Sequence, residues 1–190
     1  MITLSSRAQL LSGLGLILLL ALTRGHHFAS VEHLPSASWA VFFLAGVFLR
    51  PRWSFPLLFL EAVLLDLSYY GWSGAAAHCI TPAYALLVPA YATLWYAGRV
   101  YARLHQDRFS TLAPLLLTLL VGAFVSNLFS SGGYYFFSGN FETTSLAGLW
   151  GRIEQYFPGK LPALLGYTAV ASMLYTLSRQ YKTCQELIRT

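Results

Sequence analysis

The feature that most constrains this chain is a series of long apolar runs separated by short polar segments. A helix that crosses the hydrocarbon core of a membrane needs about 20 mainly apolar residues. The sequence therefore predicts an all-α integral membrane protein, a bundle of six transmembrane helices that forms one domain over residues 1–190. The predicted spans are Leu4–Thr23, Leu34–Leu49, Trp53–Tyr70, Ile80–Gly98, Leu112–Phe129 and Leu161–Ser178.

The composition excludes a soluble alternative. Hydrophobic residues make up 56% of the chain and charged residues only 10%, whereas soluble domains carry about 25% charged residues. So few charges cannot cover a water-facing surface. The net charge of +5 does not indicate nucleic-acid binding, because the basic residues lie at the ends of apolar runs and form no stripe. Gly159-Lys160 is followed by Leu161, so the chain lacks the loop that P-loop ATPases use.

The distribution of Lys and Arg predicts the orientation of the bundle. Nine of the twelve basic residues lie at the N-terminus, in the second and fourth loops and in the C-terminal tail. Basic residues favour the cytoplasmic side of a membrane. We therefore expect both termini in the cytoplasm and the first, third and fifth loops outside.

The fifth loop, from Ser130 to Lys160, is the longest. Its first four residues, Ser130–Gly133, predict a flexible stretch, and an aromatic cluster follows. Apolar residues then recur at helical spacing from Leu146 to Phe157, which is typical of an amphipathic helix. This loop is either an anchor on the membrane surface or a cover over a cavity that becomes ordered when a ligand binds.

Metal-binding side chains gather on the predicted outer side. The first loop carries His26 and His27, and the third carries His78 and Cys79. The second of the two cysteines, Cys184, lies in the cytoplasmic tail, so the two cannot pair. A thiolate binds soft metals, but a small buried residue is the equally plain interpretation of Cys79. The two adjacent histidines are either ligands or polar residues at the headgroup level.

Two carboxylates, Glu61 and Asp66, lie within the third apolar run. Ionisable groups in hydrocarbon are costly and usually face a polar interior. Five residues of helix place the two side chains about 140° apart, so they do not form one carboxylate pair. We expect Asp66 to approach an outer cavity, and Glu61 to pair with Ser, Tyr or Asn127 inside the bundle.

The fourth predicted span carries Tyr84, Tyr91 and Trp95 on one face. Aromatic side chains of this kind line cavities for large ligands in membrane proteins. Ordinary packing between helices accounts for the same pattern. Both interpretations stay open from the sequence.

The residues Ala75-Ala76-Ala77-His78-Cys79, before the fourth of six helices in a chain of this length, resemble the BtuM family of small bacterial vitamin B12 transporters. That family is similar to the substrate-binding S-components of energy-coupling-factor transporters. The resemblance implies a protein of the bacterial cytoplasmic membrane that takes up cobalamin. It implies an outward-facing cavity roofed by the first, third and fifth loops, with Cys79 as the axial ligand of cobalt. Thiolate-assisted decyanation of cyanocobalamin would then be an accompanying reaction.

Together these arguments predict a substrate-binding site with Cys79 on the cobalt and no other cofactor. The predicted site residues are Cys79, His78, Asp66, Tyr69, Tyr84, Tyr91, His27, Tyr134, Tyr135 and Phe136. The predicted partners are a corrinoid and the lipid bilayer. Docking on a coupling module is only weakly predicted, because the first helix has Ala8-x-x-x-Ser12 where S-components have Ala-x-x-x-Ala. Two alternatives remain: a permease for Zn, Ni or Co ions that uses Cys79 and histidines, and a haem-handling membrane protein.

The predicted orientation can be tested with the two cysteines. A membrane-impermeant maleimide added to intact spheroplasts should label Cys79 in the absence of ligand, because the charge distribution places it outside. Cys184 should react only after the membrane is permeabilised. Mass spectrometry of the labelled peptides distinguishes the two. Labelling of Cys184 alone in intact spheroplasts would reverse the orientation.

Overall fold

The computed structural model describes residues 4–24, 34–73, 82–106 and 108–189, without the side chains of 69–73, 109 and 182–189. The described part is all-helical and contains no strand. Its elements are α1 (Ser6–Thr23), α2 (Ser38–Phe48), α3 (Ser54–Ser73), the 3₁₀ helix η1 (Pro82–Leu86), α5 (Leu87–Leu104), η2 (Phe109–Thr111), α6 (Leu112–Asn127), the π-helical turn η3 (Leu128–Gly132), α7 (Gly133–Phe137) and α8 (Leu146–Arg189).

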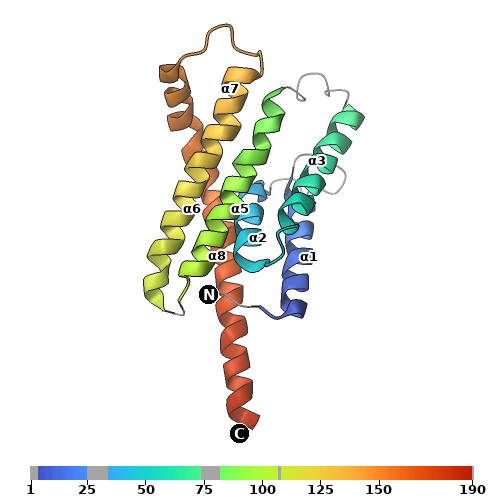
Figure 1. Cartoon of the computed structure of the whole chain (residues 1–190), viewed down its shortest axis with the longest axis vertical. Helices are drawn as coiled ribbons and strands as arrows, with labels where there is room; N and C mark the ends of the chain where they lie inside the picture. The colour runs from blue at the N-terminus through green and yellow to red at the C-terminus, as the bar shows by residue number, and fades with distance from the viewer. Residues whose placement is uncertain (1–3, 25–33, 74–81, 107, 190) are drawn as a thin grey trace.

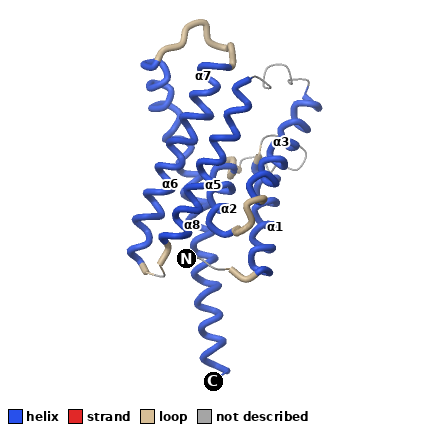
Figure 2. Tube along the Cα trace, viewed as in Figure 1, coloured by secondary structure: helices blue, strands red, loops and turns tan. Residues whose placement is uncertain are grey.

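Successive long helices run in alternating directions along one axis (Figures 1 and 2). The start of α1 meets the connection between α2 and α3, where Gln9 Oε1 accepts a hydrogen bond from the Arg50 backbone N–H at 3.1 Å. We call this the basic end, because Arg50, Arg52, Arg99 and Arg103 lie there. The other end, where α1 and α3 finish and η1 begins, we call the opposite end.

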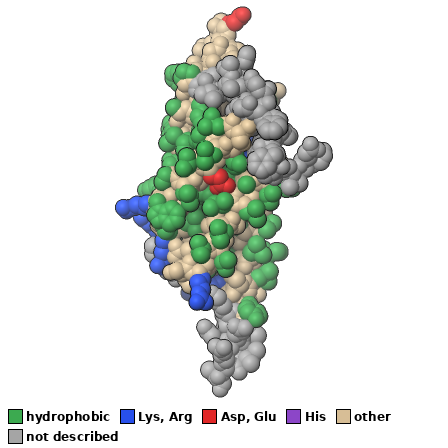
Figure 3. Space-filling view, turned by 90° about the vertical axis from the view of Figure 1, so that its right-hand side faces the viewer, with side chains coloured by type: hydrophobic (Ala, Val, Ile, Leu, Met, Phe, Trp, Pro, Cys, Tyr) green, Lys and Arg blue, Asp and Glu red, His purple; other side chains and the backbone are tan. Residues whose placement is uncertain are grey.

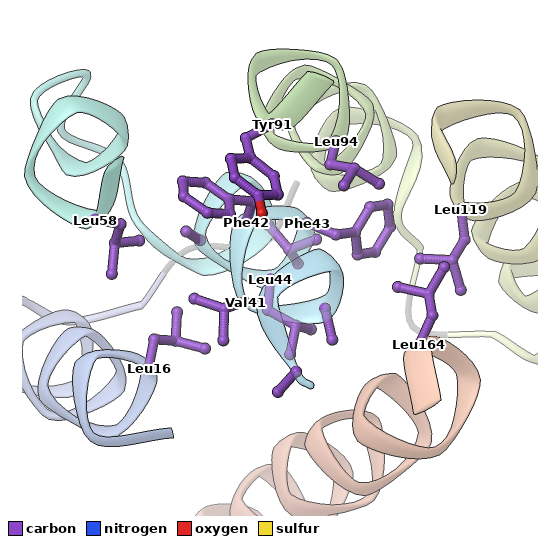
Figure 4. Close-up of a cluster of buried hydrophobic side chains, with 14 of the residues drawn as sticks. Leu16, Val41, Phe42, Phe43, Leu44, Leu58, Tyr91, Leu94, Leu119 and Leu164 are labelled. Atoms are coloured by element: carbon purple, nitrogen blue, oxygen red, sulfur yellow. The ribbon is translucent and has the colours of Figure 1, made fainter. Parts of the chain in front are cut away.

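Helix α2 forms the centre of the bundle. It contacts α1, α3, α5 and α8, and nine of its eleven residues are buried. Figure 4 shows its apolar side chains surrounded by residues of the neighbouring helices. Enclosure on all sides explains why α2 is apolar all round. The sequence predicted a span over Leu34–Leu49, but 11 helical residues extend only about 16 Å, roughly half of the hydrocarbon core.

Two glycines bring α2 and α5 into backbone contact. A Cβ atom added to Gly46 would lie 2.0 Å from the carbonyl oxygen of Trp95, and one added to Gly98 would lie 2.1 Å from that of Phe43. No side chain fits into either space. Small residues allow two helices in a membrane protein to approach this closely. Beyond the glycines, the ring of Phe42 stacks on Tyr91 with the centroids 4.3 Å apart.

The fifth loop differs from its prediction in two ways. Ser130–Gly133, predicted as a flexible stretch, is helical, and α6 continues through the π-helical turn η3 into α7. Gly133 serves packing here, since a Cβ atom at this position would lie 2.5 Å from Leu86 Cδ1. The predicted amphipathic helix and the last predicted span are a single helix, α8, with Pro158 and Pro162 in its interior.

The outer surface carries many exposed apolar side chains, among them Leu14 and Leu18 on α1, Leu60 on α3, Leu117 on α6 and Leu174 on α8. Figure 3 shows hydrophobic side chains spread over one face. The segments Ser6–Thr23, Leu112–Phe137 and Leu146–Tyr181 are long and apolar enough to cross a membrane. These features are those of a membrane protein.

Because the backbones touch at Gly46 and Gly98, adding one methyl group at either position should strongly destabilise the protein. Gly46→Ala or Gly98→Ala should lower the free energy of unfolding by about 1–3 kcal/mol or more, because overpacking forces the helices apart. The matched control is Gly166→Ala in α8, where an added Cβ meets nothing within 4 Å and alanine favours the helix. Thermal unfolding in detergent, followed by size-exclusion chromatography, measures the difference. Equal midpoints for Gly98→Ala and Gly166→Ala would contradict the contact.

Candidate functional site

A buried ion pair joins α1 and α3 at the opposite end of the bundle. Arg24 is the C-cap residue of α1, and Asp66 lies on α3. The guanidinium binds both carboxylate oxygens, with Nε 2.8 Å from Oδ1 and Nη2 2.7 Å from Oδ2. The Arg24 side chain is only 9% exposed and that of Asp66 18%. Bidentate pairs of this kind are among the strongest hydrogen-bonded contacts in proteins.

Three hydroxyl groups complete this site. Arg24 Nη1 donates to Ser38 Oγ at 3.0 Å and to Tyr91 Oη at 2.9 Å. Tyr84 Oη donates to Asp66 Oδ2 at 2.7 Å. We call these five residues the Arg24 network. It connects α1, α2, α3, η1 and α5.

The network lies beside two segments that carry the predicted metal-binding side chains. Arg24 directly precedes residues 25–33, and Ser38 follows them at the start of α2. Asp66 lies on the helix that leads into residues 74–81, and Tyr84 follows them in η1. The network therefore holds together the described helix ends on both sides of both segments.

Three predicted site residues meet in this network: Asp66, Tyr84 and Tyr91. Tyr91 is 6% exposed, with its ring stacked on Phe42, so it supports the site from within the core. Cys79, His78 and His27 lie outside the described residues. Tyr69 belongs to α3, and its side chain is not described.

The other three predicted site residues, Tyr134, Tyr135 and Phe136, lie on α7. Helix α7 packs against η1, the turn that carries Tyr84, so these aromatic residues share the opposite end with the Arg24 network. Tyr135 is buried, and its hydroxyl accepts a hydrogen bond from the backbone N–H of Ser145 at 3.2 Å. Tyr134 and Phe136 are exposed.

The guanidinium group of Arg152 contacts aromatic rings of α7, of α8 and of the segment between them. The guanidinium carbon of Arg152 lies 5.8 Å from the ring centroid of Tyr135, 4.7 Å from that of Phe141 and 5.3 Å from that of Tyr156. Such cation–π contacts stabilise by about 0.5–1 kcal/mol each at exposed sites. They join α8 to α7 and to the turn between them.

The sequence analysis did not predict that Arg24 pairs with Asp66. It counted Arg24 only among the basic residues of the first loop. The available signal was that one base and one acid each stand near the outer end of an apolar run. The partner expected for Glu61 was also wrong: its Oε2 atom is buried and has no hydrogen-bond partner in the described part of the chain. Asn127 instead accepts a hydrogen bond from Lys160 Nζ at 3.1 Å.

Lys160 was predicted to lie in an outer loop but belongs to α8 and turns into the bundle. Its ammonium group also donates to Ser131 Oγ at 3.1 Å and lies 5.1 Å from the ring centroid of Trp39. Ser131 Oγ is 2.9 Å from Asn127 Oδ1. This cluster therefore ties α8 to α2 and to the π-helical turn.

Comparison with known proteins adds no relative. No family model matches the chain, and no curated protein is significantly similar to it. Among the described residues, no group of three or more His, Cys, Asp or Glu side chains could hold a metal ion. The carboxylate of Asp66 is held by Arg24 and Tyr84, so the network connects the helices that carry these residues.

The ion pair predicts an asymmetric response to substitution. Asp66→Asn leaves Arg24 buried without a counter-charge and should lower the free energy of unfolding by about 3–5 kcal/mol. The double variant Arg24→Met/Asp66→Leu should recover much of that loss, because it removes both charges. Glu154→Gln, at an exposed carboxylate, is the control. Unfolding midpoints in detergent report the order, and an Asp66→Asn midpoint equal to the control would show that the pair is not buried.

Proposed function

We propose that this chain is a six-span protein of the bacterial cytoplasmic membrane that takes up cobalamin, with the Cys79 thiolate as the axial ligand of cobalt. The observation that best supports the proposal is the Arg24 network. It joins the helix ends that flank both of the segments on which His27, His78 and Cys79 lie. A site assembled from two such segments needs a rigid base.

Helix direction and charge support the proposed membrane placement. In this placement α1, α3, α5, α6 and α8 cross the membrane as helices, and the segment that contains the short helix α2 makes the remaining pass. The basic end faces the cytoplasm in accord with the positive-inside rule. Arg99 supports that end, because its Nη2 donates to the Arg50 carbonyl at 2.7 Å. The opposite end, with the Arg24 network, then faces outward.

The described residues supply a base and one wall for a large ligand. The base is the Arg24 network, in which charge is neutralised by a bidentate pair and hydroxyls are already bonded. The wall is α7 with the exposed aromatic residues Tyr134 and Phe136. Aromatic surfaces contribute large contact area but recognise many ligands. In this proposal the specificity for cobalamin therefore comes from its cobalt ion.

A bond between cobalt and a thiolate discriminates by chemistry, because soft thiolate ligands select transition metals. Cys79 would take the lower axial position and displace the benzimidazole of cobalamin. Its electron donation would weaken the bond on the upper face of cyanocobalamin. Cyanide would then leave with its electron pair, in a ligand exchange that changes no oxidation state.

The proposal is tested by Cys79→Ser, which keeps the size of the side chain and removes the soft donor. Wild-type protein purified with cobalamin should show a corrin spectrum shifted by thiolate ligation, and Cys79→Ser should lose both the shift and most of the bound cobalamin. Cys184→Ser is the matched control and should behave as wild type. Unfolding midpoints confirm that both variants fold.

The same spectra separate the alternatives, because corrin, haem and bare ions absorb differently. A haem spectrum, or retention of Zn, Ni or Co with no affinity for cobalamin, would replace the proposal. A Cys79→Ser protein that keeps the wild-type cobalamin spectrum would exclude thiolate ligation.

A further inference from the structure

A groove of about 400 Å³ borders α3 on the side that faces α1. One residue of α1, Ile17, lines one edge of it. The rest of the lining is a single face of α3, with residues three or four positions apart. These residues are Leu57, Leu60, Glu61, Leu64, Leu65 and Ser68.

Glu61 is the one ionisable residue in that lining. Its Oε2 atom is buried and has no hydrogen-bond partner in the described part of the chain. Leu60 and Leu64 beside it are 55% and 57% exposed, so the groove opens to the outside of the bundle. Figure 3 shows acidic atoms in the middle of a face that is otherwise largely hydrophobic.

The carboxyl group of Glu61 is remote from both ends of α3, which spans Ser54–Ser73. It lies about 10 Å from the first residue and about 18 Å from the last, at 1.5 Å per residue. A glutamate side chain cannot reach the headgroups from that depth. The inference therefore rests on the membrane placement proposed above, and it is independent of cobalamin.

The other charged residues on the two elements beside the groove are Arg7 and Arg24 on α1 and Asp66 on α3, and Arg24 attracts the Glu61 carboxylate. Arg24 at the end of α1 and Asp66 on α3 hold one another in the bidentate pair. A charged carboxylate without a cation costs several kcal/mol or more in an apolar environment. Uptake of one proton by Glu61 removes that cost.

We propose that Glu61 is an intramembrane proton-binding site open to the lipid through this groove. One carboxyl group in an apolar lining cannot satisfy the coordination of a metal ion. A proton needs no further ligand. The site takes up and releases a single proton at the Glu61 carboxyl.

The proposal is tested with dicyclohexylcarbodiimide, an apolar reagent that enters from the lipid and reacts with protonated carboxyl groups. The acid proton passes to a carbodiimide nitrogen, and the carboxyl oxygen bonds to the central carbon. The adduct rearranges to a stable N-acylurea and nothing leaves. Peptide mass spectrometry of the whole chain, treated in its native membranes and again after purification, should locate one intact carbodiimide on Glu61. Labelling should fall as the pH is raised.

Glu61→Gln should abolish the labelling, whereas Glu154→Gln should not change it. Asp66 should stay unmodified, because Arg24 binds both of its carboxylate oxygens. Absence of label on Glu61 in both preparations would overturn the proposal. Label on Glu61 only after purification would overturn it too, since a cation of a partner protein would then occupy the groove in the membrane. Cobalamin binding by Glu61→Gln, measured on the same samples, separates this result from that of the proposed function.

Discussion

The contact of α2 with α5 is the constraint on which the arrangement of the other helices depends. Gly46 and Gly98 let the two backbones touch, so a helix of 11 residues can be enclosed completely. Because α2 is apolar on every side, α1, α3, α5 and α8 can all pack against it. The long helices then meet lipid with their outer faces, where the exposed leucines lie.

Enclosing α2 creates a problem at its first turn, where helices leave backbone N–H groups without partners. The Thr23 side chain resolves part of it by accepting a hydrogen bond from the Ala37 backbone N–H at 3.1 Å. Arg24 then binds Ser38 of the same turn. The end of α1 thus supplies polar contacts to the start of α2. The ion pair with Asp66 connects the same Arg24 to α3, so two consecutive residues at the end of α1 bind both α2 and α3.

The helices could be predicted from the sequence wherever hydropathy alone decides them. The predicted span Leu4–Thr23 agrees closely with α1, Ser6–Thr23. The predicted span Ile80–Gly98 stops too early, because the helix continues to Leu104. Basic residues often mark the end of an apolar run, but Arg99 lies within α5, with its guanidinium carbon 4.4 Å from the ring centroid of Trp95.

The candidate site was predictable only in part. The cost of a carboxylate in hydrocarbon indicated that Asp66 needs polar surroundings, and its oxygens bind Arg24 and Tyr84, whereas the outer cavity expected beside it stays a prediction. Its partner could not be found by spacing, since Arg24 lies 42 positions away in the sequence. Glycine pairs carry a similar ambiguity: Gly132 and Gly133 suit a hinge or close packing equally well. In the structure Gly133 packs closely against Leu86, so it serves close packing and not a hinge. No local pattern in the sequence shows that contact.

Lys160 and Glu61 are two ionisable side chains of the bundle that form no salt bridge within the described part of the chain. Lys160 turns inward, where two oxygen atoms accept its hydrogen bonds and Trp39 offers a ring face. These contacts replace part of the hydration that the ammonium group loses on burial. Glu61 has no comparable set among the described residues, because its buried oxygen meets no donor. A carboxyl group becomes neutral when it takes up one proton. Burying the neutral group in the apolar groove costs less free energy than burying the carboxylate.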